Sequence, residues 1–339
     1  MKNLLLILTS TILLSCGSNI ITNQTTNSLI VTGKVATKFA NTITTKDLKE
    51  YLYAFASEEF EGRETGELGQ KKAAEYLKNF YVEHHIASPY GGTDYFQSIP
   101  TEHLRPELNP SENVVAFIKG SEKPDEIIMI SAHYDHLGVN GDEIYYGADD
   151  DGSGTVAILE IAEAFQEAVL AGNRPKRSIL FLHVTGEEKG LLGSKYYTNF
   201  PIFPLENTVT DLNIDMIGRV DEAHTNNPNF VYLIGSDKLS TELHDLSEEI
   251  NARFTQLNLD YTFNDENDPN RFYYRSDHYN FAKNNIPIIF YFNGTHEDYH
   301  KPTDTPDKIN YEILAKRAQL IFYTAWEIAN KEHRIKVDN

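Results

Sequence analysis

The sequence has little cysteine, fewer basic than acidic residues, and no hydrophobic run long enough to span a bilayer. One cysteine among 339 residues excludes an intrachain disulfide and a thiolate-rich metal cluster, so histidine and carboxylates must hold any metal. The chain has 30 Lys+Arg against 50 Asp+Glu, a formal net charge of −20. We therefore expect no nucleic-acid partner, because that would need a basic face.

Two common catalytic signatures are also missing. No glycine-rich stretch forms a Walker motif or a dinucleotide fingerprint, so we expect no nucleotide partner. No serine lies in a nucleophile elbow, since Ser153 lies in an aspartate-rich turn. The remaining composition, 40% hydrophobic and 24% charged, is typical of a globular protein with a substantial core.

Residues 1–16 have the pattern of a secretion signal, with one lysine followed by an apolar run that is too short to cross a membrane. Leu13-Leu14-Ser15-Cys16 resembles the bacterial lipobox, which predicts acylation of Cys16 and a lipid anchor to the membrane. The alternative is an ordinary signal peptide with an incidental cysteine. Residues 17–45, rich in Asn, Thr and Ser, are expected to be a flexible tether. The predicted location is the cell envelope of a Gram-negative bacterium, on the outer membrane and facing the periplasm.

From residue 46 onward the hydrophobic pattern predicts an α/β fold with a mostly parallel central sheet and helices on both faces. We expect an N-terminal helical flank over 46–110 and a catalytic domain over 111–330. Short apolar runs predict strands at 114–118, 127–130, 179–182, 212–216, 230–234 and 286–292. Apolar residues at helical spacing predict helices at 46–59, 68–84, 153–170, 240–257 and 311–330.

Acidic and histidine residues follow most of these strands. In parallel sheets the carboxyl ends of the strands converge on one edge, where ligands bind. Each group alone has an ordinary explanation, such as a helix cap or a wet surface pair. Together they indicate a metal site, because adjacent carboxylates repel one another unless a cation neutralises them. The groups are His133 with Asp135, the run Asp149 to Asp151, Glu187 with Glu188, Asp215, and Asp298 to His300.

These motifs resemble the co-catalytic di-zinc aminopeptidases of the bacterial leucyl aminopeptidase type. The same superfamily contains glutamate carboxypeptidases and glutaminyl cyclases. The resemblance rests on His133-Tyr134-Asp135, the segment 147–154, Gly186-Glu187-Glu188, Asp215-Met216 and Tyr299-His300, and it covers about residues 110–325. It implies an α/β/α sandwich fold of the zinc exopeptidase/phosphorylase-like type.

The resemblance also implies roles for individual residues and two Zn²⁺ per chain. His133 and Asp215 would bind one zinc, Glu188 and His300 the other, and Asp150 would bridge both. Asp135 would orient His133, and Glu187 would be the general base that takes a proton from the metal-activated water. Tyr299 would stabilise the oxyanion, and the pocket wall would include Arg275, Ser276, Asp277 and His278. The implied activity is release of N-terminal amino acids from peptide substrates.

Three other functions stay open from the sequence. A glutaminyl cyclase would use one zinc, but such enzymes lack the histidine that His133 supplies. A carboxypeptidase or dipeptidase would need a cation for the substrate's carboxylate, and Arg219, Arg271 and Arg275 are candidates. A catalytically silent peptide-binding lipoprotein would be expected to lack a ligand or the base.

Overall fold

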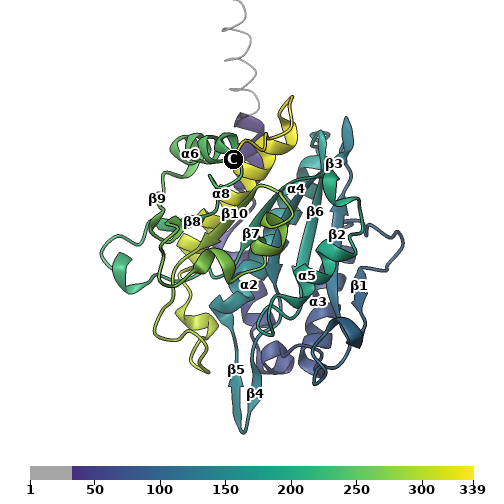
Figure 1. Cartoon of the computed structure of the whole chain (residues 1–339), viewed down its shortest axis with the longest axis vertical. Coiled ribbons are helices and arrows are strands. Elements are labelled where there is room, and N and C mark those ends of the chain that lie inside the picture. The colour runs from purple at the N-terminus through teal and green to yellow at the C-terminus, as the bar shows by residue number, and fades with distance from the viewer. Residues whose placement is uncertain (1–32) are drawn as a thin grey trace, which may run out of the picture.

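The computed structural model describes residues 33–339 and is built around one eight-stranded sheet, with strand order β1-β2-β6-β3-β7-β10-β8-β9 (Figure 1). The four middle strands run parallel, whereas β2 is antiparallel to β6 and β8 is antiparallel to β10. This confirms the predicted, mostly parallel sheet. The strands are β1 (Phe96–Ile99), β2 (Ser111–Ile118), β3 (Lys123–His133), β6 (Arg177–Val184), β7 (Thr208–Ile214), β8 (Phe230–Ile234), β9 (Asn258–Asp260) and β10 (Ile288–Phe292).

Helices cover both faces of the sheet. From residue 45 onward the α-helices are α2 (Thr45–Phe55), α3 (Leu68–Glu83), α4 (Gly154–Leu170), α5 (Leu192–Asn199), α6 (Thr241–Ile250), α7 (His278–Ala282) and α8 (Tyr311–Asn330). Helices α2, α4 and α8 pack together over one face, and α5 and α7 cover the other. Alternate residues of β3 therefore enter different cores: Ile128 and Ile130 face α4 and α8, while Ile127 and Met129 face α7.

All six expected strands and all five expected helices are present. The strand at 230–234 and the helix at 311–330 have the predicted bounds, and α6 is shorter because Asn251–Thr255 continues as a π-helical turn. Several short elements were not predicted: the edge strands β1 and β9, the hairpin of β4 (Gly138–Asn140) and β5 (Glu143–Tyr145), and the helices α5 and α7. The segment 46–110 therefore supplies a strand to the main sheet as well as helices.

The expected flexible tether needs correction at its end. Residues 33–40 are helical, and Ala36, Phe39 and Ala40 are buried in the main core with Ile43. Their spacing of three and four residues places them on one helical face, which explains the packing. The predicted signal peptide, the lipobox cysteine Cys16 and the rest of the tether lie outside the described residues. Within residues 33–339, no helix is long and apolar enough to cross a membrane.

Candidate metal centre

The predicted ligands meet beyond the carboxyl ends of the parallel strands, at the edge from which the β4–β5 hairpin projects (Figure 1). His133 is the last residue of β3, Asp215 follows β7, and Glu188 lies in the turn after β6. A small cavity opens there. Its polar wall includes Asp150, Glu187, Asp215 and His300, and its apolar wall includes Met216, Phe272, Phe290 and Phe292.

Asp150 lies between two histidines. One carboxylate oxygen, Oδ1, is 3.2 Å from His133 Nε2, and the other, Oδ2, is 3.1 Å from His300 Nε2. Asp215 Oδ1 is 3.6 Å from His133 Nε2, and Glu188 Oε2 is 3.3 Å from His300 Nε2. The five residues therefore form two half-sites that share the Asp150 carboxylate, as the resemblance implies.

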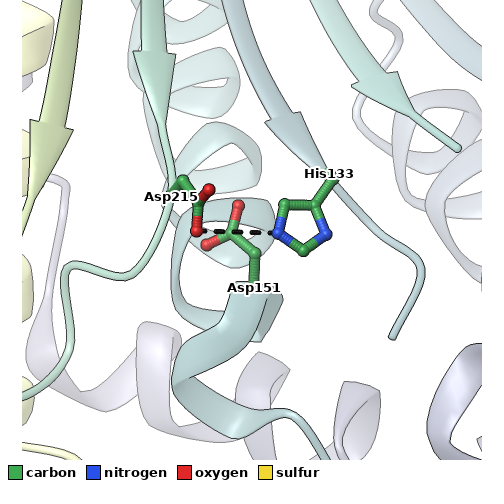
Figure 2. A group of neighbouring side chains, drawn as sticks. All are labelled: His133, Asp151 and Asp215. Carbon is green, nitrogen blue, oxygen red and sulfur yellow. Dashed lines mark ion pairs between the residues drawn. The ribbon is translucent and has the colours of Figure 1, made fainter. Parts of the chain in front are cut away.

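Asp151 also lies beside the first half-site, which the sequence did not predict. Figure 2 shows its carboxylate close to His133 and Asp215, and ligand atoms of the three residues lie within 4.8 Å of one another. Asp151 Oδ1 accepts hydrogen bonds from the backbone N–H of Met216 and Gly154, both at 3.0 Å. Its carboxylate is thus held by the start of α4 and by the residue after Asp215. The Asp150–Asp151 peptide bond is cis.

The donor atoms fit a bound metal ion. Buried polar atoms normally have hydrogen-bond partners, yet His133 Nε2, Asp150 Oδ2, Asp151 Oδ2 and Glu188 Oε1 have none. Imidazole nitrogens and carboxylate oxygens are ligands that zinc accepts. Burial favours the neutral form of Asp150, but the contacts with His133 and His300 outweigh it and hold its pKa well below the usual range. The bridging carboxylate is therefore ionised, as a ligand must be.

Glu187 and Asp135 connect the two strand ends. The backbone N–H of Glu187 donates to Asp135 Oδ1 at 3.1 Å, and Thr65 Oγ1 donates to Asp135 Oδ2 at 2.8 Å. His133 Nδ1 is 3.0 Å from the backbone oxygen of Asp135 and 3.7 Å from its Oδ1. Asp135 thus orients His133 chiefly through its carbonyl. Burial raises the pKa of Glu187 well above its usual range.

A buried arginine holds the loops around the site. The Arg63 guanidinium donates to the carbonyl oxygens of Tyr134 at 2.9 Å, Phe55 at 3.2 Å, and Tyr146 and Gly147 at 2.8 Å. It therefore links the segment after β3 to the turn that precedes Asp149. Although nearby carboxylates raise it, burial lowers the pKa of Arg63 to about 10, which leaves the side chain charged at neutral pH.

Two of the four residues expected in the pocket wall line the cavity. Arg275 and Ser276 line the cavity, but Asp277 and His278 are fully buried outside its lining. Asp277 accepts a hydrogen bond from Ser194 Oγ, and His278 Nε2 is 2.8 Å from the backbone oxygen of Tyr273. These two side chains face inward because they lie where α7 begins and packs against α5. They support the wall and do not form it.

Tyr299 and one of the three candidate arginines reach the cavity. Burial raises the pKa of Tyr299, so its hydroxyl stays protonated, and its ring stacks on His300 with centroids 3.9 Å apart. Arg219 pairs with Asp298 at 2.9 Å, and Arg271 stacks on Tyr274 in a neighbouring depression. Arg275 lines the cavity and stacks on Phe272 at 4.9 Å.

His136 also lies at this site and was not predicted from the sequence. This residue is fully buried, and its Nδ1 is 3.0 Å from Glu188 Oε1. His136, Asp150 and Glu188 form a second group whose ligand atoms lie within 4.8 Å of one another. The spacing of two residues between His133 and His136 was the available signal.

One family model and several known proteins match parts of this chain. The model of peptidase family M28 matches residues 113–325. The chain is 41% identical over 85 residues to a vacuolar membrane protease of Verticillium alfalfae and 36% identical over 116 residues to mouse aminopeptidase NAALADL1. These matches cover 25% and 34% of this chain but 8% and 15% of those proteins.

Solved structures share the fold. The Legionella pneumophila aminopeptidase LapA is 21% identical with a TM-score of 0.68, over 89% of this chain and 76% of that one. The Porphyromonas gingivalis glutaminyl cyclase is 16% identical with a TM-score of 0.63, over 83% of this chain and 97% of that one. Since the family model spans more than half of the sequence and includes every predicted metal ligand, the chain belongs to peptidase family M28.

Proposed function

We propose that this protein is a zinc-dependent aminopeptidase that releases N-terminal amino acids from peptides. The observation that carries the proposal is the position of Asp150 between His133 and His300, with Glu187 lining the same cavity. Membership of peptidase family M28 and the similarity to mouse aminopeptidase NAALADL1 support the same activity.

The ligand set favours two zinc ions per chain. His133, Asp215 and Asp150 Oδ1 would hold one, and His300, Glu188 and Asp150 Oδ2 would hold the other. When bound, zinc lowers the pKa of a coordinated water toward about 7 and polarises a substrate carbonyl.

The chain's own residues supply the proton chemistry. Glu187 lines the cavity without being needed in either half-site, so its carboxylate is free to accept a proton from the attacking water. Its burial makes it a stronger base than an exposed glutamate. The protonated Glu187 then donates to the departing amine. The Tyr299 hydroxyl is placed to donate a hydrogen bond to the oxygen on which negative charge develops.

The charge of the cavity favours an N-terminal substrate end. Glu187 is the lining carboxylate that neither half-site uses, and Arg275 is the one arginine in the lining. The Glu187 carboxylate gives a free α-ammonium group an acceptor, which a free carboxylate could not use. A carboxypeptidase or dipeptidase remains the second candidate, because Arg275 would suit a substrate carboxylate. A single-zinc cyclase is disfavoured by the paired half-sites, and a silent binding protein by the presence of every ligand and of Glu187.

The products of one peptide in three forms test the proposal. The peptide is supplied unmodified, N-acetylated or C-terminally amidated, and the released residues are identified by mass spectrometry. We expect release from the N-terminus of the unmodified and amidated forms and no release from the acetylated form. Release from the C-terminus, blocked by amidation, would establish the carboxypeptidase instead.

We also propose that Cys16 carries a lipid that anchors the enzyme in the cell envelope. The support is the sequence pattern at residues 13–16 alone. Cys16→Ser is expected to move the protein from the membrane fraction to the soluble fraction. Membrane association that is unchanged in this variant would contradict the anchor.

A further inference from the structure

His136 is the one imidazole at the metal centre to which neither the resemblance nor the comparisons give a role. Its side chain is completely buried, and neither ring nitrogen makes a well-aligned hydrogen bond, although Nδ1 lies 3.0 Å from Glu188 Oε1. Its backbone N–H donates to the Arg63 carbonyl at 3.2 Å, which fixes the residue at the end of the loop. An unpaired buried imidazole is costly, so its position calls for a partner.

The space for this ring depends on a glycine. A Cβ atom at Gly147 would lie 2.5 Å from His136 Cγ and 2.3 Å from the backbone oxygen of Asp150. The turn that precedes the aspartate run thus leaves room for the His136 ring against the bridging carboxylate.

The ring nitrogen Nδ1 faces the second half-site. It is 3.0 Å from Glu188 Oε1 and 3.9 Å from Asp150 Oδ2, and the His136 ring lies edge-on to that of His300, with centroids 5.9 Å apart. His300 Nε2 approaches the same two carboxylates at 3.1 and 3.3 Å. Donors that share one tetrahedral zinc, each about 2.0–2.1 Å from it, lie roughly 3.3 Å apart. Asp150 and Glu188 thus lie close to both imidazoles, and ligand atoms of His136, Asp150 and Glu188 lie within 4.8 Å of one another.

We propose that His136, through Nδ1, is a fourth protein ligand of the second metal ion, with Asp150, Glu188 and His300. This inference rests on the proposed two-zinc site. The alternative is that His136 binds no metal and only donates a hydrogen bond from Nδ1 to Glu188 Oε1 at 3.0 Å; the number of coordinating histidines distinguishes the two roles. Two imidazoles at one half-site and one at the other make the halves chemically unequal. The second half-site then prefers zinc to harder cations such as magnesium or manganese.

X-ray absorption of the zinc-loaded wild-type enzyme tests the ligand directly and needs no variant. Three coordinating histidines shared by two zincs give about 1.5 imidazoles per zinc, and two histidines give about 1.0. With two zincs bound, a value near 1.5 supports the inference. A value near 1.0 with two zincs and an active enzyme overturns it and leaves the proposed function standing. One zinc per chain overturns both the inference about His136 and the proposed two-zinc site.

Zinc retention in variants gives an independent readout. His136→Ala is dialysed against buffers of fixed free zinc, and zinc per chain is measured by mass spectrometry. We expect the second equivalent to need more than about 100-fold more free zinc than in the wild type, with the first retained, because loss of a residue that only orients a ligand costs about 10–100-fold. His183→Ala is the matched control, because His183 is equally buried but pairs with the Tyr81 hydroxyl at 2.6 Å. Equal retention in His136→Ala and wild type would overturn the inference.

Discussion

The backbone N–H of Glu187 donates a hydrogen bond to the side chain of Asp135 at 3.1 Å. This contact ties the turn after β6 to the end of β3, where the same Asp135 also holds the ring of His133 through its carbonyl. The proposed base and the first metal ligand are thus positioned by one residue. A shift of either turn would move both groups together.

Glu187→Gln separates catalysis from metal binding. The amide keeps the size of the side chain but cannot accept the proton, so kcat is expected to fall by about 10²–10⁴-fold. Zinc content should not change, because Glu187 belongs to neither half-site. Full activity in a variant that binds both zincs would remove Glu187 from the mechanism.

Arg63→Met is expected to lower the free energy of unfolding by about 3–5 kcal/mol, because four carbonyl oxygens lose a buried charged partner. The variant should also bind zinc more weakly, since the loops that carry Asp150 and His133 loosen. Arg177→Met is the control: Arg177 is equally buried but bonds Glu126 and the carbonyls of Ile328 and Lys331. Denaturant unfolding and zinc retention are measured for both variants, and only Arg63→Met is expected to lose zinc more readily than the wild type. Identical zinc retention in both variants would contradict a role for Arg63 at the site.

Gly147→Ala should disturb the metal centre by a steric clash. The backbone there has a φ of +53°, and a Cβ would lie 2.3 Å from the Asp150 oxygen. Gly141 has a similar φ of +63° with nothing within 4 Å of its Cβ, so Gly141→Ala measures the backbone cost alone, about 1–2 kcal/mol. We expect Gly147→Ala to cost a further ~1–3 kcal/mol in thermal unfolding and to weaken zinc binding. Equal losses in the two variants would contradict the close packing.

Glu160, which is not part of the cavity lining, should make stability depend on pH. Its Oε2 accepts from the Thr44 backbone N–H, and burial raises its pKa to about 8, aided by Glu163 and Asp47. The folded protein therefore holds a proton that the unfolded chain releases near pH 4.5. The resulting stabilisation is present below about pH 4.5 and is lost as pH rises toward 8.

Glu160→Gln keeps the acceptor and removes the titration. The difference in unfolding free energy between variant and wild type should grow in the variant's favour by roughly 2–4 kcal/mol between pH 5 and pH 8. Denaturant titrations of both proteins across this range measure it. A difference that is constant with pH would contradict the buried proton.

Much of the fold follows from the sequence because the central strands are short apolar runs separated by amphipathic helices. The five expected ligands could be placed together because strand ends converge in such a sheet. The positions of Asp151 and His136 at the site could not be predicted, because their contacts depend on how the turns before α4 and after β3 fold back.

Other features depend on contacts between distant segments. Phe39 and Ile43 lie in a polar stretch and become core residues only because they pack on the main hydrophobic cluster. Asp277 and His278 match a wall motif, but the packing of α7 against α5 decides that they face inward.

The most direct test of the central claim is a zinc titration of the metal-free protein, with bound zinc and release of an N-terminal amino acid measured together. We expect no release without zinc, and a rate that reaches its plateau as two equivalents per chain are bound. Release by the metal-free protein, or two bound zincs without any release from a panel of unblocked peptides, would contradict the account.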